Sequence, residues 1–197
     1  MKISFLILIV LSTLSSGQVS IPVRDTNGNV LRSGTKYYIV PAKRGAGGGL
    51  ITARGGGFWC PSEVAQEVSD ELDGKPLSFV PANPNKDGII YESTDLNIKF
   101  EDPHSCAPGS VWKVVVDNFV TPMVYNQGVL GNPGRETISN WFKIQKFEDH
   151  YKLVYCPSVC KSCKPKCADI GSAITNDRGR RSLVLNNIPF KVKFKKT

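Results

Sequence analysis

Two histidines, His104 and His150, are the only imidazoles from which this sequence could build a general base. Neither lies in a catalytic motif, because the chain contains no Gly-x-Ser-x-Gly elbow and no His-Glu-x-x-His pair. The glycines at 47 to 49 are not followed by Gly-Lys-Ser/Thr, so they predict a tight hairpin and not a phosphate-binding loop. These patterns favour a binding protein over an enzyme.

Four of the six cysteines form a cluster, Cys156, Cys160, Cys163 and Cys167. Zinc sites of four cysteines normally divide into two knuckles separated by about a dozen or more residues, which this cluster lacks, so we expect no metal. A redox role for Cys160 and Cys163 is disfavoured because no βαβ pattern surrounds them. Six cysteines in an exported protein predict three disulfides, and spacing alone leaves their pairing open.

The N-terminus predicts that export. An apolar run from Ile3 to Leu14 follows Lys2 and precedes Ser15, Ser16 and Gly17, the pattern of a cleaved signal peptide, here residues 1–17. We expect the mature domain to be residues 18–197, secreted to the extracellular space (apoplast) or carried to the vacuole through the secretory pathway. The formal charge of +8 favours acidic partners or cell-wall polyanions, although scattered basic residues mainly maintain solubility.

Short β-rich runs separated by turn signals fill this domain and predict an all-β sandwich or barrel. In the last run, alternation places Phe190, Val192 and Phe194 on one face and lysines on the solvated face. The only helical candidate is the segment from Ser62 to Leu72, which lacks a clean apolar stripe. The other predicted runs are 37–40, 50–52, 77–79, 96–100, 111–115, 141–144, 151–155 and 183–185.

The segment from Val23 to Leu31, followed by Tyr37-Tyr38-Ile39, resembles the N-terminal signature of the plant Kunitz inhibitors of the soybean trypsin inhibitor type. The resemblance covers the mature chain and is strongest to the miraculin-like branch. The further matching segments are 47–50, 93–100, 111–112, 131–134, 141–144, 151–157, 167–171 and 180–181.

This resemblance implies a β-trefoil of twelve strands with pseudo-threefold symmetry, half of them closing a small barrel. It also implies the disulfide pairing: Cys60 with Cys106, Cys156 with Cys167, and Cys160 with Cys163. No cofactor, metal, nucleic-acid or membrane partner is expected, and the protein should be a monomer.

Family inhibitors act through an exposed loop that enters a serine protease like a substrate, and the resemblance places Lys86 at the specificity position. A lysine suits a trypsin-like pocket, whose buried carboxylate favours a cation. Two positions depart from the pattern. Asp87 follows Lys86 where many active members carry an apolar or basic residue, and Ser33 replaces the family's loop-bracing asparagine. The expected reactive loop is Pro84, Asn85, Lys86, Asp87, Gly88 and Ile89.

The alternative function is a non-inhibitory, miraculin-like protein of defence, wound response or storage. A carbohydrate-binding trefoil is disfavoured, because lectin trefoils repeat Gln-x-Trp and none of Trp59, Trp112 and Trp141 has a glutamine two residues before it.

Overall fold

The computed structural model describes residues 20–45, 47–54, 60, 62–102, 109–117, 120–175 and 179–197. The predicted signal peptide, His104 and Cys106 lie outside these residues. Within them the protein is all-β, and the 3-10 turn η1 (Ile138–Asn140) is the one helical element. No helix in the described part of the chain is long and apolar enough to cross a membrane.

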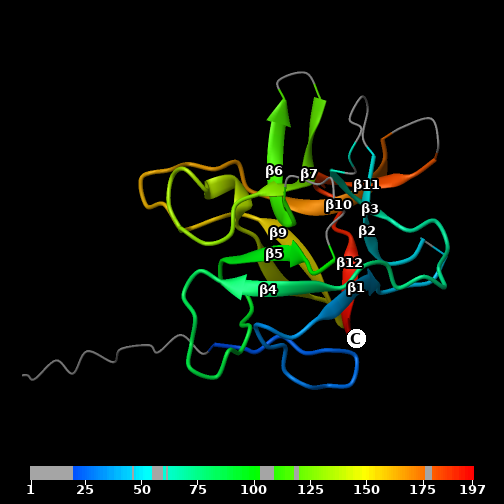
Figure 1. Ribbon diagram of the computed structural model, residues 1–197, viewed down its shortest axis with the longest axis horizontal. Helices are drawn as coiled ribbons and strands as arrows, with labels where there is room; N and C mark the ends of the chain where they lie inside the picture. The colour runs from blue at the N-terminus through cyan, green and yellow to red at the C-terminus, as the bar shows by residue number, and fades with distance from the viewer. Residues whose placement is uncertain are drawn as a thin grey trace, which may run out of the picture.

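Six strands close into a barrel at the centre of the molecule (Figure 1). Antiparallel pairs join β1 to β4, β4 to β5, β8 to β9, β9 to β12 and β12 back to β1. A bridge between Leu96 in β5 and Phe142, the residue before β8, completes the ring. The six strands are β1 (Tyr37–Pro41), β4 (Leu77–Pro81), β5 (Leu96–Phe100), β8 (Lys143–Phe147), β9 (His150–Tyr155) and β12 (Lys191–Lys196).

The other six strands form three hairpins, and single-residue bridges connect each hairpin to the other two. Barrel pairs and hairpins therefore recur every four strands along the chain. The hairpins are β2 (Leu50–Ala53) with β3 (Glu63–Gln66), β6 (Val111–Asp117) with β7 (Val120–Gly128), and β10 (Ala168–Ile174) with β11 (Arg181–Asn186).

Buried aromatic rings fill the barrel. Phe79 from β4 meets Phe194 from β12 edge to face at 5.5 Å between centroids, and Trp112 meets Phe142 in the same way at 5.9 Å. These four side chains are fully buried, and such pairs contribute about 0.5–1.5 kcal/mol each beyond the area they bury. The rings therefore join β4 to β12, and β6 to the residue that precedes β8.

The predicted alternation at the last strand is confirmed, since Phe190, Val192 and Phe194 are buried. Each predicted run overlaps a strand. The helical candidate is wrong: Glu63–Gln66 is strand β3, with all four residues buried between neighbouring strands.

The predicted hairpin at the glycine run is also wrong. Gly48 and Gly49 donate backbone hydrogen bonds to the carbonyl oxygens of Glu67 and Leu72, both at 2.8 Å. A Cβ on Gly49 would lie 1.9 Å from the carbonyl oxygen of Asp73. These glycines therefore allow the chain to run close against residues 67–74, and β1 and β2 are paired with other strands.

Candidate protease-binding loop

The expected reactive loop joins β4 to β5 and presents its tip to solvent. Pro84, Lys86 and Asp87 are exposed, whereas Asn85, Gly88 and Ile89 are half-buried. The chain returns to the core at Ile90, which is fully buried. The two charged side chains at the tip are therefore the part of the loop that a partner meets first.

The tip is a hydrogen-bonded turn. The Gly88 amide donates to the carbonyl oxygen of Asn85 at 3.1 Å, so Lys86 and Asp87 occupy the two central positions. Gly88 has φ +65°, a backbone conformation that favours glycine, and a Cβ there would lie 2.8 Å from the Ser33 hydroxyl. Any larger residue at Gly88 would strain this turn.

The Asn85 side chain closes the loop beneath that turn. Its Oδ1 accepts a hydrogen bond from the Ile89 amide at 2.9 Å, and its Nδ2 donates to the Ile89 carbonyl oxygen at 2.7 Å. Asn85 thus binds both backbone polar groups of Ile89 across the loop. The resulting clamp holds the base of the turn while leaving Lys86 free.

The returning arm of the loop is also held by residues near the N-terminus of the domain. Ser33 donates its backbone amide to the Gly88 carbonyl at 2.7 Å, and the Arg32 guanidinium Nη1 donates to the Asp87 carbonyl. The Ile90 amide donates to Leu31 at 2.9 Å. The family resemblance predicts a bracing asparagine where Ser33 stands, and in the structure other groups brace the loop. Arg32 was not predicted from the sequence, and Asn85 was predicted as a residue of the loop but not as the side chain that closes it.

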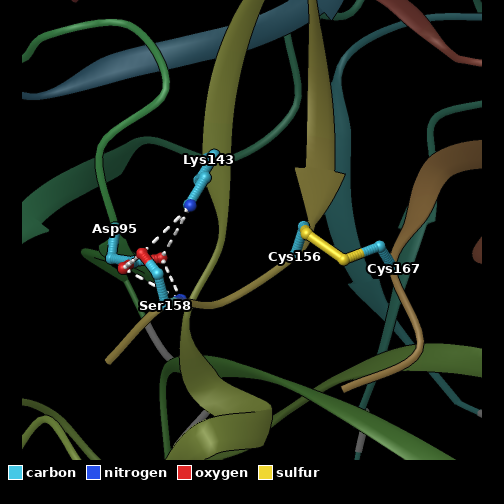
Figure 2. The surroundings of a disulfide bond; sticks show 5 residues. All are labelled: Asp95, Lys143, Cys156, Ser158 and Cys167. Carbon is cyan, nitrogen blue, oxygen red and sulfur yellow. Dashed lines mark hydrogen bonds and ion pairs between the residues drawn. A yellow bond between two sulfur atoms is a disulfide. The ribbon is translucent and has the colours of Figure 1, made fainter. Parts of the chain in front are cut away.

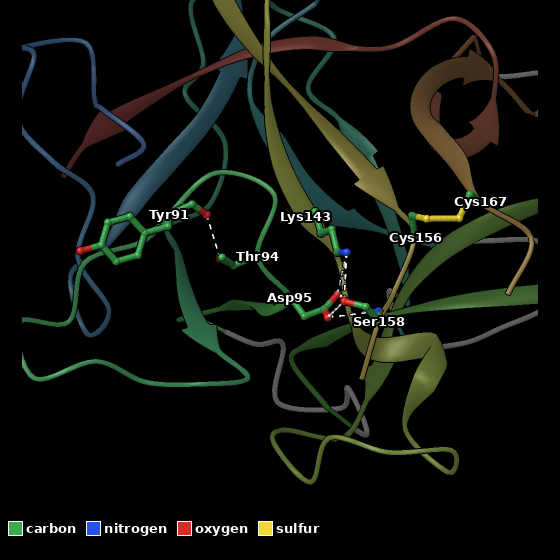
Figure 3. Close-up of polar contacts among 7 residues, drawn as sticks. All are labelled: Tyr91, Thr94, Asp95, Lys143, Cys156, Ser158 and Cys167. Atoms are coloured by element: carbon green, nitrogen blue, oxygen red, sulfur yellow. Dashed lines mark hydrogen bonds and ion pairs between the residues drawn. A yellow bond between two sulfur atoms is a disulfide. The ribbon is translucent and has the colours of Figure 1, made fainter. Parts of the chain in front are cut away.

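An ionic cluster holds the stem where β5 begins. The Asp95 carboxylate accepts hydrogen bonds from the amide and hydroxyl of Ser158 and lies 3.7 Å from Lys143 Nζ (Figure 2). The Asp95 backbone carbonyl accepts from the Ala82 amide at 2.8 Å, on the other side of the stem. Figure 3 shows this cluster beyond Tyr91 and Thr94, which close the neighbouring turn with a 2.8 Å hydrogen bond.

Two of the three expected disulfide pairs are present, Cys156 with Cys167 and Cys160 with Cys163. Cys60 is disulfide-bonded, but its expected partner Cys106 lies outside the described residues. Among the described residues, no group of three or more histidine, cysteine, aspartate and glutamate side chains is arranged to hold a metal ion.

The buried carboxyl group of Glu63 lies in β3, where the hairpins meet, and not at the loop. Burial raises its pKa above the ordinary value of 4.5, although a hydrogen bond from Ser182 and the charge of Arg180 oppose this effect. Ser182 in turn accepts a hydrogen bond from Thr175 at 2.9 Å. Glu63 is thus held by the Ser182 hydroxyl, which Thr175 supports, at the junction of the hairpins.

Comparison with known proteins identifies relatives over most of the chain. Miraculin from Synsepalum dulcificum is 45% identical over 89% of this chain and 83% of its own length. Kunitz trypsin inhibitor 5 from Arabidopsis thaliana is 41% identical, over 89% and 85%.

Two solved structures are similar in fold. The Kunitz-type cysteine protease inhibitor PCPI-3 from potato aligns with a TM-score of 0.78 and 35% identity, over 91% of this chain and 98% of its own. Soybean trypsin inhibitor, in its complex with porcine pancreatic trypsin, aligns with a TM-score of 0.73 and 30% identity, over 89% and 98%.

The family described as "Trypsin and protease inhibitor", the legume Kunitz type, matches residues 23–196. That match includes every described strand and the whole Lys86 loop. Its members are inhibitors and not enzymes, in agreement with the absence of catalytic motifs from the sequence. The chain belongs to the Kunitz family of plant trypsin and protease inhibitors.

Proposed function

We propose that this protein inhibits a serine protease of trypsin-like specificity by presenting Lys86 to the enzyme in the manner of a substrate. The observation that carries the proposal is the clamp from Asn85 to Ile89, which supports an exposed lysine on a braced loop. A loop that is ordered before binding loses less conformational entropy when it binds. The lysine supplies the cation that the acidic pocket of a trypsin-like protease favours.

The turn at the tip favours a second candidate, a non-inhibitory miraculin-like protein of defence, wound response or storage. A peptide that binds as an added strand forms main-chain hydrogen bonds to its partner in an extended conformation. Lys86 and Asp87 instead lie inside a turn closed by the bond from Gly88 to Asn85. The Asp87 carboxylate would also lose hydration at the enzyme surface. Inhibition therefore requires either that the turn opens on binding or that the active site of the protease binds Lys86 in the closed turn.

We further propose that the inhibitor is the monomeric mature domain 18–197, released from a leader of residues 1–17 and secreted to the apoplast or vacuole. Disulfides support an oxidising compartment. The pairing pattern that recurs every four strands supports a β-trefoil of three four-stranded units. The third bridge would join Cys60 to Cys106.

The test is titration of the oxidised mature protein against trypsin, chymotrypsin, a papain-like protease and an aspartic protease. Variants Lys86→Ala and Lys86→Arg are compared with Lys196→Ala, which removes an exposed lysine from β12. We expect tight trypsin inhibition that Lys86→Ala weakens by about thirtyfold or more, as for a central interface residue. Lys86→Arg and Lys196→Ala should retain it.

Failure of the wild type to inhibit any of the four enzymes would support the non-inhibitory candidate. Inhibition of the papain-like enzyme alone, unchanged by Lys86→Ala, would contradict both the serine target and the Lys86 loop.

A further inference from the structure

The segment from Cys156 to Cys167, here called the stapled loop, carries an unbalanced positive charge. It contains Lys161, Lys164 and Lys166, all exposed, and no aspartate or glutamate. Arg135, also exposed, approaches from the loop before η1 and donates from Nη2 to the Ser162 hydroxyl at 3.2 Å. We call these four side chains the cationic face.

The charges of the cationic face are available to a partner. None of its four side chains forms an ion pair within the described residues. Two other lysines of neighbouring strands are instead paired with carboxylates. Lys143 is paired with Asp95, and Lys152 is paired with Asp169 at 2.8 Å. Unpaired charges of one sign add their potentials and attract an oppositely charged chain.

The backbone that carries these lysines is held in place before any partner binds. The Cys156–Cys167 disulfide closes the loop at its base, and the Cys160–Cys163 disulfide closes a turn inside it, with the Cys163 amide donating to Cys160 at 3.2 Å. At one end, Ser158 is bound by the Asp95 carboxylate (Figure 2). The loop therefore presents its lysines with little backbone entropy left to lose.

The turn between Cys160 and Cys163 also excludes one use for the exposed lysine within it. A protease reads its substrate as an extended segment, and the Cys160–Cys163 disulfide prevents the turn that contains Lys161 and Ser162 from opening, a constraint that the Lys86 turn lacks. The stapled loop is thus unsuited to act as a second substrate-like loop. What the loop offers a partner is a surface of exposed lysines.

We propose that the cationic face binds an acidic polysaccharide, one whose carboxylates repeat along a linear chain such as a polyuronate. Disulfides are rare in the cytosol and nucleus, where nucleic acids are concentrated. Among the described residues every aromatic ring is buried or half-buried, so none is presented for base stacking. The anionic leaflet of a cell membrane faces the cytoplasm. Resting on the secretion proposed above, this leaves an extracellular carboxylate polymer as the partner that fits.

The experiment measures binding of the oxidised protein to polygalacturonate at several salt concentrations. We expect affinity to fall as salt rises, because exposed charges are screened. The triple variant Lys161→Gln/Lys164→Gln/Lys166→Gln should bind about tenfold more weakly or worse. A matched variant with the same charge change on the β1–β12 side, Lys36→Gln/Lys193→Gln/Lys196→Gln, should bind nearly as the wild type does.

Equal weakening by the two triple variants would overturn the proposal, because net charge alone would then explain binding. Equal binding to the fully methyl-esterified polymer, or tighter binding to phosphatidylserine vesicles, would overturn the assignment to a carboxylate polysaccharide. Trypsin titration of the same variants keeps this result separate from the function of Lys86, since neither set of substitutions touches that loop.

Discussion

Asn85 and Ile89 are joined by two hydrogen bonds, from the Ile89 amide to Asn85 Oδ1 and from Asn85 Nδ2 to the Ile89 carbonyl. The two residues flank the exposed tip of the loop, so one side chain fixes the separation of both arms. The clamp therefore couples the exposure of Lys86 to the order of the backbone beneath it.

Replacing Asn85 with alanine should loosen the tip without unfolding the domain. Two hydrogen bonds are lost at a half-buried site, and we expect a loss of about 1–2 kcal/mol in the free energy of unfolding. Trypsin should cleave the loop after Lys86 faster than in the wild type, as measured by mass spectrometry over time. The control is Asn83→Ala, because the exposed Asn83 side chain makes no hydrogen bond within the described residues. Equal cleavage rates in the two variants would contradict the clamp.

Glu63 should make the protein less stable as the pH rises above about 4.5. Burial raises the pKa of this carboxyl, so between 4.5 and the raised value the folded state binds more protons than the unfolded state. The free energy of unfolding must then fall with increasing pH through that window. Glu63→Gln, which cannot ionise but keeps an acceptor for Ser182, should remove this component, as measured by denaturant unfolding across pH.

Glu101 offers a control of opposite sign. Burial alone would raise its pKa, but hydrogen bonds from Ser78 and Lys99, with the charges of Lys99 and Lys36, hold it below the ordinary value. Its stabilising contribution is present above pH 4.5 and is lost as the pH falls through the lowered pKa. Glu101→Gln should therefore weaken the acid dependence that Glu63→Gln leaves intact. Identical pH profiles for the two variants would contradict this assignment.

Gly49→Ala should destabilise the domain severely, because its Cβ would lie 1.9 Å from the Asp73 carbonyl oxygen and 2.4 Å from the carbonyl carbon. Relieving such overlap requires the backbone to move, and we expect a loss of about 1–3 kcal/mol or more. The control is Gly134→Ala, whose Cβ would lie 4.0 Å from its nearest neighbour, the Asn132 carbonyl oxygen. Thermal unfolding measures both, and a Tm for Gly49→Ala equal to that of Gly134→Ala would refute the close approach.

The barrel strands could be predicted from the sequence because they alternate between core and solvent, as Phe190, Val192 and Phe194 do. Strand β3 could not, since Glu63 and Gln66 are polar yet buried between two neighbouring strands. A strand buried on both faces has no period of two to detect. The glycine run was misread for a related reason: its role is a contact with residues 67–74, which no local pattern reveals.

At the candidate site, the family resemblance predicted Lys86 as the residue at the specificity position. In the structure Lys86 lies on the exposed tip of the loop. The bracing by Arg32 was not predictable, because that residue and Asp87 are 55 positions apart in the chain and meet only after folding. Asn85 did leave a local signal. An asparagine before a turn that ends in glycine commonly bonds backbone groups a few residues ahead.

The pairing of β1 with β12 has a consequence for the order of events in the cell. Strand β12 follows every other described strand in the sequence. Strand β1 therefore has no partner on this side of the barrel until the ribosome has made Lys191–Lys196. Phe79 then lacks its edge-to-face neighbour Phe194, and Thr26 lacks the Phe194 carbonyl to which its amide is bound at 2.8 Å. The N-terminal segment that supports the Lys86 loop is already bonded to Gly88 and Ile90, but it gains its bond to Phe194 only once β12 has been made, so the loop reaches its full bracing late in translation.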